Sequence, residues 1–290
     1  MKTNRFSFPG AIAGLVLLLM VAACQKNVSG PSAAGQSSVN LYLTDDPSLV
    51  FDKVLIDIRK LEVKVEDNDQ ERHESEHQLE ADDNDKHGDT TGGWIQLAIH
   101  PGVYDILQFR NGLDTLFTTA GFPNTHALKK IRLTLGTLNS VVLNGVSFPV
   151  SISNNDNVVV IKLDESPAVF NASGHADIWI DFDAGNSIRL HGSNFELKPS
   201  VKSFSKEKSG SIEGRVLPAD AKAMVMAING ADTASAKPGS EGEFKIVGLK
   251  SGSYSLLFHA TAGNYKDTTI QQVMVAGKED TKTGTVTLHK

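Results

Sequence analysis

Four polar and aromatic side chains of types that suit ligand binding lie within eight positions of the stretch DIWIDFDAGNS. They are Trp179, Asp181, Asp183 and Asn186. On a strand, Asp181 and Asp183 would share one face, and with Asn186 in the following turn they could bind Ca²⁺ through hard oxygens. An exposed Trp179 could stack on a sugar ring. The alternatives are an outer sheet face that ends in an Asx turn, and burial of Trp179 against a second domain.

A second group of candidate ligands lies in the most acidic part of the chain. The segment from 66 to 89 has eleven carboxylates, two basic residues and one large aliphatic residue. It has too little to bury, so we predict a disordered insertion over 66–91. Asp83, Asp85 and His87 resemble the first half of an EF-hand loop, but Trp94 stands where that loop needs a bidentate Glu. The two alternatives for this segment are weak binding of a divalent ion and a solvated acidic loop that binds none.

Catalytic motifs are absent from the sequence. It has no G-x-S-x-G elbow, phosphate-binding loop, H-E-x-x-H or paired cysteine motif. His100, His126, His175 and His191 lie in or beside strand-like segments without a recognisable partner spacing, and a structural or surface role is expected for each. We therefore expect a non-catalytic protein. The alternative is a hydrolase on glycans or peptides whose site is not recognisable from sequence.

The N-terminal stretch predicts where the protein is located. Two basic residues precede an apolar run over 11–20, which is too short to span a bilayer, and small residues then lead to Cys24, the single cysteine. Val21-Ala22-Ala23-Cys24 resembles a bacterial lipobox, which implies a signal peptide over 1–23 and a lipidated Cys24. An ordinary signal peptide with an incidental cysteine is the alternative. Gln25 after the cysteine favours the outer membrane.

The charge of the mature chain limits its partners. The whole chain has 28 basic and 34 acidic side chains, and removal of residues 1–23 takes away Lys2 and Arg5, which leaves 26 against 34, formally −8. This argues against nucleic acid as a partner. Residues 24–37 are rich in Ser, Gly and Ala and are predicted to be a flexible tether. The expected partners are the membrane, through the lipid, and a glycan or an envelope protein.

Short alternating segments that must position these side chains follow the tether. Val54, Ile56 and Ile58 alternate, and the pattern then slips to Leu61 and Val63, which predicts a β-bulge near Arg59-Lys60. Asn144-Gly145 between apolar runs predicts a tight hairpin. The apolar run Val158–Leu163 predicts a strand buried on both faces. No long amphipathic helix is found, so an antiparallel β-sandwich over 38–203 is expected.

Several landmarks in this first part resemble a known family. They are Leu43-Thr44-Asp45-Asp46-Pro47, Trp94-Ile95-Gln96-Leu97, Lys130-Ile131-Arg132-Leu133, the DFDAGNSI stretch over 181–188 and LKPSV over 197–201. In this order they resemble the bacterial lipoprotein family known as domain of unknown function 4382. That family has no established activity, so the resemblance implies a cell-envelope setting but no mechanism.

The pattern changes after a charged linker over 204–209. The sequence then runs from Ile212-Glu213-Gly214-Arg215-Val216 to Gly242-Glu243-Phe244 and on to Leu249-Lys250-Ser251-Gly252-Ser253-Tyr254. This order resembles the carboxypeptidase regulatory-like domain, a small prealbumin-like sandwich grouped with carbohydrate-binding-like folds, and would cover 210–290. The whole chain is thus predicted to be two tandem antiparallel β-sandwiches that serve as a binding, adhesion or assembly module, with a glycan as one candidate ligand. No cofactor is expected, apart from the Ca²⁺ considered above.

Overall fold

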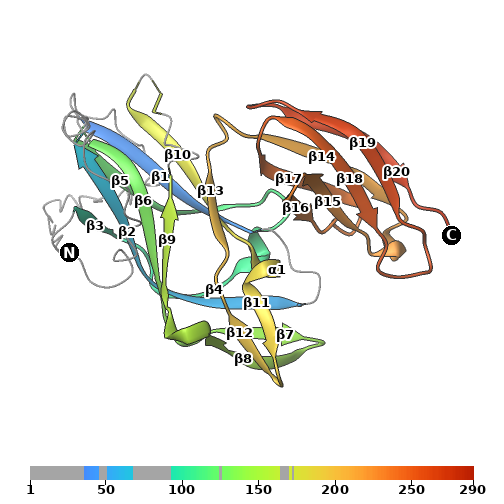
Figure 1. Cartoon of the computed structure of the whole chain (residues 1–290), viewed down its shortest axis with the longest axis horizontal. Coiled ribbons are helices and arrows are strands. Elements are labelled where there is room, and N and C mark those ends of the chain that lie inside the picture. Colours follow the sequence, from blue (N-terminus) through green and yellow to red (C-terminus); the bar gives the residue numbers. More distant parts are fainter. Residues whose placement is uncertain (1–35, 46–50, 68–92, 124–125, 164–169, 172) are drawn as a thin grey trace, which may run out of the picture. The chain divides into compact units, whose positions relative to one another are not determined.

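The computed structural model describes residues 36–45, 51–67, 93–123, 126–163, 170–171 and 173–290 (Figure 1). The predicted lipidation site Cys24 and the candidate metal ligands Asp83, Asp85 and His87 lie outside the described residues. Within these ranges almost all regular structure is β-strand, which confirms the predicted all-β class. No helix among them has the length and hydropathy needed to cross a membrane.

The strands between residues 36 and 204 form two sheets. The first has the order β13-β10-β1-β5, and its strands are β1 (Gln36–Thr44), β5 (Thr115–Pro123), β10 (His175–Phe182) and β13 (Val201–Phe204). The second follows the path β11-β12-β8-β7-β2-β6-β9, with β3 and β4 also paired to β2. Its strands are β2 (Lys53–Asp67), β3 (Trp94–Leu97), β4 (Gly102–Asp105), β6 (His126–Leu135), β7 (Ser140–Leu143), β8 (Val146–Ile152), β9 (Val158–Lys162), β11 (Ile188–His191) and β12 (Asn194–Leu197).

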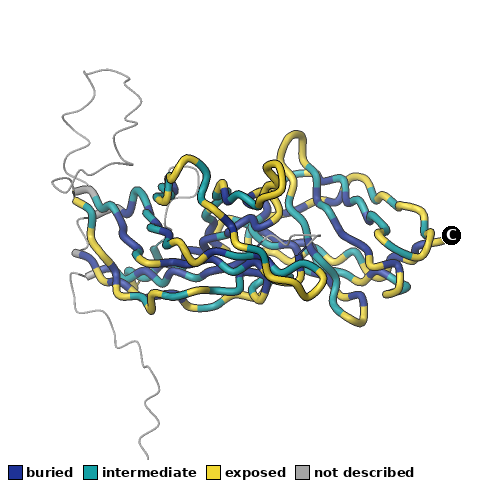
Figure 2. Tube along the Cα trace, turned by 90° about the horizontal axis from the view of Figure 1, so that it is seen from below, coloured by how far each residue is buried: buried dark blue, intermediate teal, exposed yellow. Residues whose placement is uncertain are grey.

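These two sheets share one hydrophobic core, as expected of a sandwich. Val39, Leu41 and Leu43 of β1 are fully buried, and Ile56 and Ile58 of β2 belong to the same cluster. Buried residues alternate with more exposed ones along the strands (Figure 2). Each strand therefore has a core face, fixed by its apolar residues, and an outer face on which polar residues can be placed.

Two local predictions for the first sandwich are confirmed. The pairing of β2 with β6 shifts register between Ile58 and Lys60, where the slip in the apolar pattern predicted a bulge. Asn144 and Gly145 have φ angles of 51° and 76°, as the tight turn between β7 and β8 requires. The prediction of a strand buried on both faces is wrong, because β9 ends the path of its sheet and most of its residues are only half-buried.

The strands between residues 210 and 287 form two further sheets around a second hydrophobic core. One has the order β17-β14-β20, with β14 (Gly210–Leu217), β17 (Glu243–Leu249) and β20 (Asp280–Thr287). The other has the order β16-β15-β18-β19, with β15 (Met224–Asn229), β16 (Asp232–Ala236), β18 (Gly252–His259) and β19 (Thr268–Val275). Tyr254, Leu256 and Phe258 of β18 face the core together, as their alternation indicated.

The strand directions and some segment boundaries differ from expectation. The sheets are mostly antiparallel, but β1 pairs with β10, β12 with β8, and β14 with β20 in parallel. Strand β1 already begins at Gln36, inside the predicted tether, because its first residues pair with the end of β5. Phe204, which we placed in the linker, is the last residue of β13 because it pairs with Trp179 of β10.

Candidate functional site

The outer face of the first sheet carries a cluster of polar and aromatic side chains that the parallel register of β1 and β10 brings together. The register sets three pairs side by side: Ser38 with His175, Asn40 with Asp177, and Tyr42 with Trp179. The residues between them, such as Leu41 and Ile178, are fully buried in the core. All six side chains of the three pairs therefore belong to the opposite, outer face. We call these six residues, together with Thr119, the polar face.

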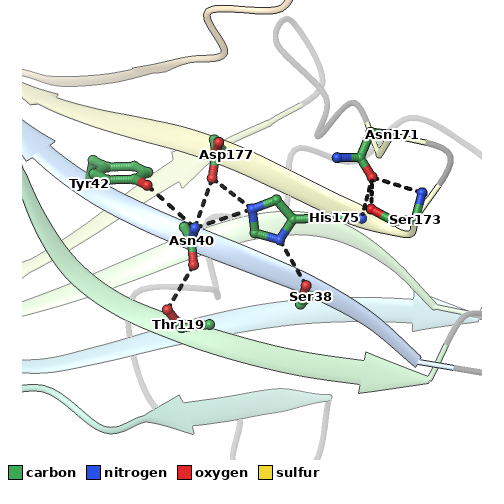
Figure 3. A network of polar contacts seen from close by, with 8 residues as sticks. All are labelled: Ser38, Asn40, Tyr42, Thr119, Asn171, Ser173, His175 and Asp177. Atoms are coloured by element: carbon green, nitrogen blue, oxygen red, sulfur yellow. Dashed lines mark hydrogen bonds and ion pairs between the residues drawn. The ribbon is translucent and has the colours of Figure 1, made fainter. Parts of the chain in front are cut away.

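Asn40 is the centre of a hydrogen-bond network on the polar face (Figure 3). Its Nδ2 donates to Oδ1 of Asp177 at 3.0 Å and to the hydroxyl of Tyr42 at 3.4 Å. Its Oδ1 accepts from the hydroxyl of Thr119 on β5 at 2.7 Å. One amide thus connects three strands. Desolvation by burial raises the pKa of the Tyr42 hydroxyl, and the charge of Asp177 raises it further, so this phenol is neutral at pH 7.

His175 lies between Ser38 and Asp177. Its Nδ1 is 2.8 Å from Oγ of Ser38, and its Nε2 is 2.9 Å from Oδ1 of Asp177. An ionised carboxylate only accepts hydrogen bonds, so Nε2 donates to Asp177, and in the tautomer protonated at Nε2 alone Nδ1 can accept from the Ser38 hydroxyl. Nε2 is also 3.2 Å from Nδ2 of Asn40, which in this tautomer is a close contact between two donors. The side chains of His175 and Asp177 remain 28% and 38% exposed.

The turn before β10 fixes the position of His175. Oδ1 of Asn171 accepts hydrogen bonds from the backbone N and hydroxyl of Ser173 at 2.9 and 2.6 Å, and from the backbone N of His175 at 3.0 Å. Asn is favoured in such turns because its side chain can take the place of a backbone acceptor. The first residue of β10 is therefore held by the segment that leads into it.

An aromatic stack continues the polar face toward β13. The ring of Tyr42 lies 4.7 Å from that of Trp179 with an interplanar angle of 10°, and the Trp179 and Phe204 rings are 5.8 Å apart at 14°. Nε1 of Trp179 donates to Oδ2 of Asp114 at 2.7 Å. Nζ of Lys206 lies 4.1 Å from the centre of the Trp179 ring and donates to the same Asp114 oxygen.

Trp179 does not offer a free ring to a sugar. It is on the predicted outer face, but it is only 7% exposed because Tyr42, Phe204 and Lys206 cover it. The expectation that Trp179 itself stacks on a sugar is therefore wrong. Tyr42, at the open end of the stack, is the half-buried aromatic residue that a ligand on this face could reach.

Asp183 and Asn186 bind each other rather than forming an open set of oxygens with Asp181. Asp183 is only 3% exposed and begins the single helical turn α1 (Ala184–Ser187). It accepts from the backbone N of Asn186 at 2.9 Å and from its Nδ2 at 2.7 Å. Asp181 stays on β10, opposite Lys202 of β13. The capping turn, which was the alternative, is the arrangement present, and it holds Asp183 inward.

Three of the five landmark motifs of the sequence converge on this same helical turn. Oδ1 of Asp45 accepts from the backbone N of Ala184 at 3.1 Å. The backbone N of Asp183 donates to the carbonyl of Ser200 at 3.0 Å, and the backbone N of Ser200 donates to Oγ of Ser187 at 2.9 Å. The LTDDP, DFDAGNSI and LKPSV stretches thus meet in one buried hydrogen-bond cluster, and in the described residues their role is structural.

Metal binding finds no support in the described ranges, which contain no group of three or more His, Cys, Asp or Glu side chains placed to hold an ion. Apart from Trp179 and His175, the polar face consists of residues that the sequence did not single out for binding, namely Ser38, Asn40, Tyr42, Thr119 and Asp177. His175 was considered only as a structural residue. Strand periodicity predicts which residues share a face, but a parallel pairing between residues 137 positions apart could not be deduced from it.

The fold and this face define an all-β protein with a hydrogen-bonding and aromatic surface on one sheet. The family model described as Domain of unknown function (DUF4382) matches residues 36–199. This is more than half of the chain, and the chain belongs to that family. No curated protein matches the sequence.

Solved structures give only distant likenesses. A type II cohesin–X-dockerin complex from Acetivibrio cellulolyticus is 24% identical over 27% of this chain and 56% of that chain, with a TM-score of 0.23. The TIE protein of Bacillus anthracis is 10% identical over 87% of this chain and 34% of that one, with a TM-score of 0.21. The shaft pilin SpaA of Lactobacillus rhamnosus GG is 8% identical over 88% and 97%, also at 0.21. At these TM-scores the likenesses carry no argument about function.

Proposed function

We propose that this protein is a non-catalytic, lipid-anchored protein of the outer membrane whose polar face binds a glycan. The observation that carries the proposal is the network centred on Asn40, in which amide, carboxylate and phenol groups are held in fixed orientations on a half-exposed sheet face. Groups that are already oriented lose little freedom when a ligand binds. The anchor is supported by the sequence around Cys24, and the second sandwich is proposed to be a carboxypeptidase regulatory-like accessory domain.

The chemistry of the polar face suits the hydroxyl groups of a sugar. Both hydrogen bonds that Asp177 receives from Asn40 and His175 use its Oδ1, so a carboxylate with its two oxygens retains capacity to accept from a ligand hydroxyl. Tyr42 adds an aromatic ring beside these acceptors. Polar groups that fix orientation next to an aromatic surface are the usual composition of a small-ligand site.

A glycan array with purified full-length protein in detergent tests the binding proposal. We expect a saturable hit that Asn40→Ala and Asp177→Ala weaken at least tenfold, because each removes a group that binds ligand and orients its neighbours. Asn194→Ala, at an exposed residue of β12, is the matched control and should bind like the wild type. A blank array, or equal binding by all variants, would rule out this face. Arrays read in Ca²⁺ and in EDTA distinguish binding by the polar face from Ca²⁺-dependent binding by the acidic segment that contains Asp83 and Asp85.

The anchor has its own test. Growth with labelled palmitate should label the wild-type protein and leave a Cys24→Ala variant unlabelled, and the label should fractionate with the outer membrane. Label that persists in the Cys24→Ala variant, or an unlabelled wild type, would contradict lipidation at this cysteine.

A hydrolase is the second candidate, and one observation favours it. Ser38, His175 and Asp177 form a hydrogen-bonded line in which the imidazole lies between a serine hydroxyl and a carboxylate, the order of residues in a Ser-His-Asp triad. Hydrolytic triads usually bury this carboxylate, whereas Asp177 is more than one third exposed, so it orients the ring less firmly. Labelling of Ser38 by a fluorophosphonate, together with ester turnover that Ser38→Ala abolishes, would support the hydrolase over the binding module.

A further inference from the structure

A pocket of about 280 Å³ in the second sandwich is lined by the connection between β14 and β15 and the connection between β16 and β17. Its apolar lining comes from Val216, Pro218, Ala223 and Pro238. Two lysines, Lys222 and Lys237, complete it. The volume is just below that of typical pockets for small molecules, so a ligand of only a few heavy atoms would fit.

Backbone hydrogen bonds hold both walls of the pocket in place. The backbone N of Val216 donates to the carbonyl of Gly242 at 2.8 Å, and the N of Gly242 donates to the carbonyl of Gly239 at 3.0 Å. Gly242 has a φ of +87°, and a Cβ there would lie 2.1 Å from the Val216 carbonyl oxygen, so this approach requires glycine. The connection between β14 and β15 is also held by the hydroxyl of Thr261, which donates to the carbonyl of Lys222 at 2.6 Å. The pocket is therefore formed before any ligand arrives.

The two lysines give the pocket a positive charge, which the charge of Asp52 offsets only in part. Neither forms an ion pair with a carboxylate in the ranges that the structure describes. Lys222 has a left-handed backbone with a φ of 45°, a conformation that favours Gly or Asn over Lys. Burial lowers the pKa of the Lys237 ammonium, and the positive charges of Arg110 and Lys222 lower it further, against the attraction of Asp52. An anion between the lysines would relieve this repulsion.

We propose that this pocket binds an organic carboxylate with a compact apolar body. The carboxylate would accept charge-assisted hydrogen bonds from Lys222 and Lys237. The apolar part would lie against Val216, Ala223 and the two prolines, where a fully hydrated inorganic anion such as phosphate would lose water without compensation. The same chemistry is found in a free small acid and in the C-terminal residue of a peptide.

Saturation-transfer NMR on the methyl signals of isobutyrate, with the purified full-length protein, tests this site. We expect isobutyrate to bind and its neutral analogue isobutyramide not to bind. Lys222→Gln and Lys237→Gln should each weaken isobutyrate binding roughly tenfold, since each removes one charged donor. Lys198→Gln, which makes the same charge change at an exposed residue of the first sandwich, should bind like the wild type.

A second pair of ligands distinguishes a free small acid from a peptide C-terminus as the origin of the bound carboxylate. A tripeptide that ends in valine is compared with its C-terminal amide. Tighter binding by the peptide acid than by isobutyrate assigns the pocket to peptide C-termini, and binding by isobutyrate alone assigns it to free small acids. Equal binding of isobutyrate and isobutyramide, or isobutyrate binding that survives both lysine substitutions, would overturn the proposal.

Discussion

Replacement of Trp179 by alanine should destabilise the first sandwich strongly. The ring is only 7% exposed, so almost all of its apolar surface would return to water or leave a void. A buried aromatic side chain covers roughly 150–250 Å², which at about 25 cal/mol per Å² corresponds to about 4–6 kcal/mol. Measured losses for Trp→Ala are about 3–5 kcal/mol because the surroundings relax in part. We therefore expect a loss of about 4 kcal/mol in the free energy of unfolding.

Trp179→Phe separates the stacking from the indole hydrogen bond. Phenylalanine can keep the contacts with Tyr42 and Phe204, but it loses the 2.7 Å hydrogen bond to Asp114. Asp114 stays paired with Lys206 and is partly exposed, so the loss of this hydrogen bond costs little free energy. The expected cost is about 1 kcal/mol, roughly a quarter of that of the alanine variant.

Urea denaturation followed by tryptophan fluorescence measures the free energy of unfolding of both variants. The chain has two tryptophans, and the remaining one, Trp94 of β3, lies in the same sandwich with Arg132 4.2 Å from its ring centre. It therefore reports the unfolding of this sandwich in each Trp179 variant. A cost below about 1 kcal/mol for Trp179→Ala, or equal costs for the two variants, would refute the claim that the stack buries and holds this ring.

Three further predictions concern single contacts. The first two use the same urea assay, and the third, in the second sandwich, which has no tryptophan, uses urea unfolding followed by circular dichroism. Asp183→Ala removes the acceptor at the start of α1 and should cost about 2 kcal/mol, while Asp183→Asn should cost less; no loss for alanine would contradict the capping role. Burial alone would raise the pKa of Glu62, but hydrogen bonds from Arg132 and Lys60 outweigh it and lower the pKa from its ordinary 4.5. Its stabilising contribution is thus fully present above pH 4.5 and is lost as the pH falls through the lower folded value. Glu62→Gln should therefore be costly at pH 7 and cost progressively less as the pH falls below 4.5, and a pH-independent cost would contradict this. Gly214→Ala places a Cβ 2.8 Å from a carbonyl oxygen of β20 and should cost more than about 1 kcal/mol; wild-type stability would show that the strands can separate there.

The sequence predicted features that depend on neighbouring residues. Alternation revealed the core face of β2, and a one-residue slip revealed its bulge, because burial acts on each side chain separately. The Asn144-Gly145 turn followed from backbone sterics alone. The burial of β9 was predicted wrongly for a related reason. Valine at successive positions is typical of a central strand, but it is also compatible with the edge of a sheet, and only the pairing decides between them.

The candidate site depends on pairing between distant segments, which a single sequence does not contain. Trp179 was recognised as an outward residue, yet its exposure depends on Tyr42, which is brought beside it by parallel pairing across more than 130 residues. Asp183 and Asp181 were placed on one face by strand periodicity. The strand ends at Phe182, however, and Asp183 turns inward as a helix cap. Both errors come from applying strand alternation to questions that tertiary contacts decide.

The two kinds of polar cluster in the first sandwich suggest where function should be sought. Three of the landmark motifs meet around α1, where Asp183 is 3% exposed and Asp45 5%, so their hydrogen bonds are made within the protein and few remain for a ligand. Such a cluster gives these residues a role in folding. The polar face differs, because its side chains also bind one another but His175 and Asp177 stay in contact with solvent. Under the proposed function, recognition of a ligand falls to residues outside the landmark motifs. Substitutions of Asn40 and Asp177, unlike those of Trp179, should then change binding more than folding.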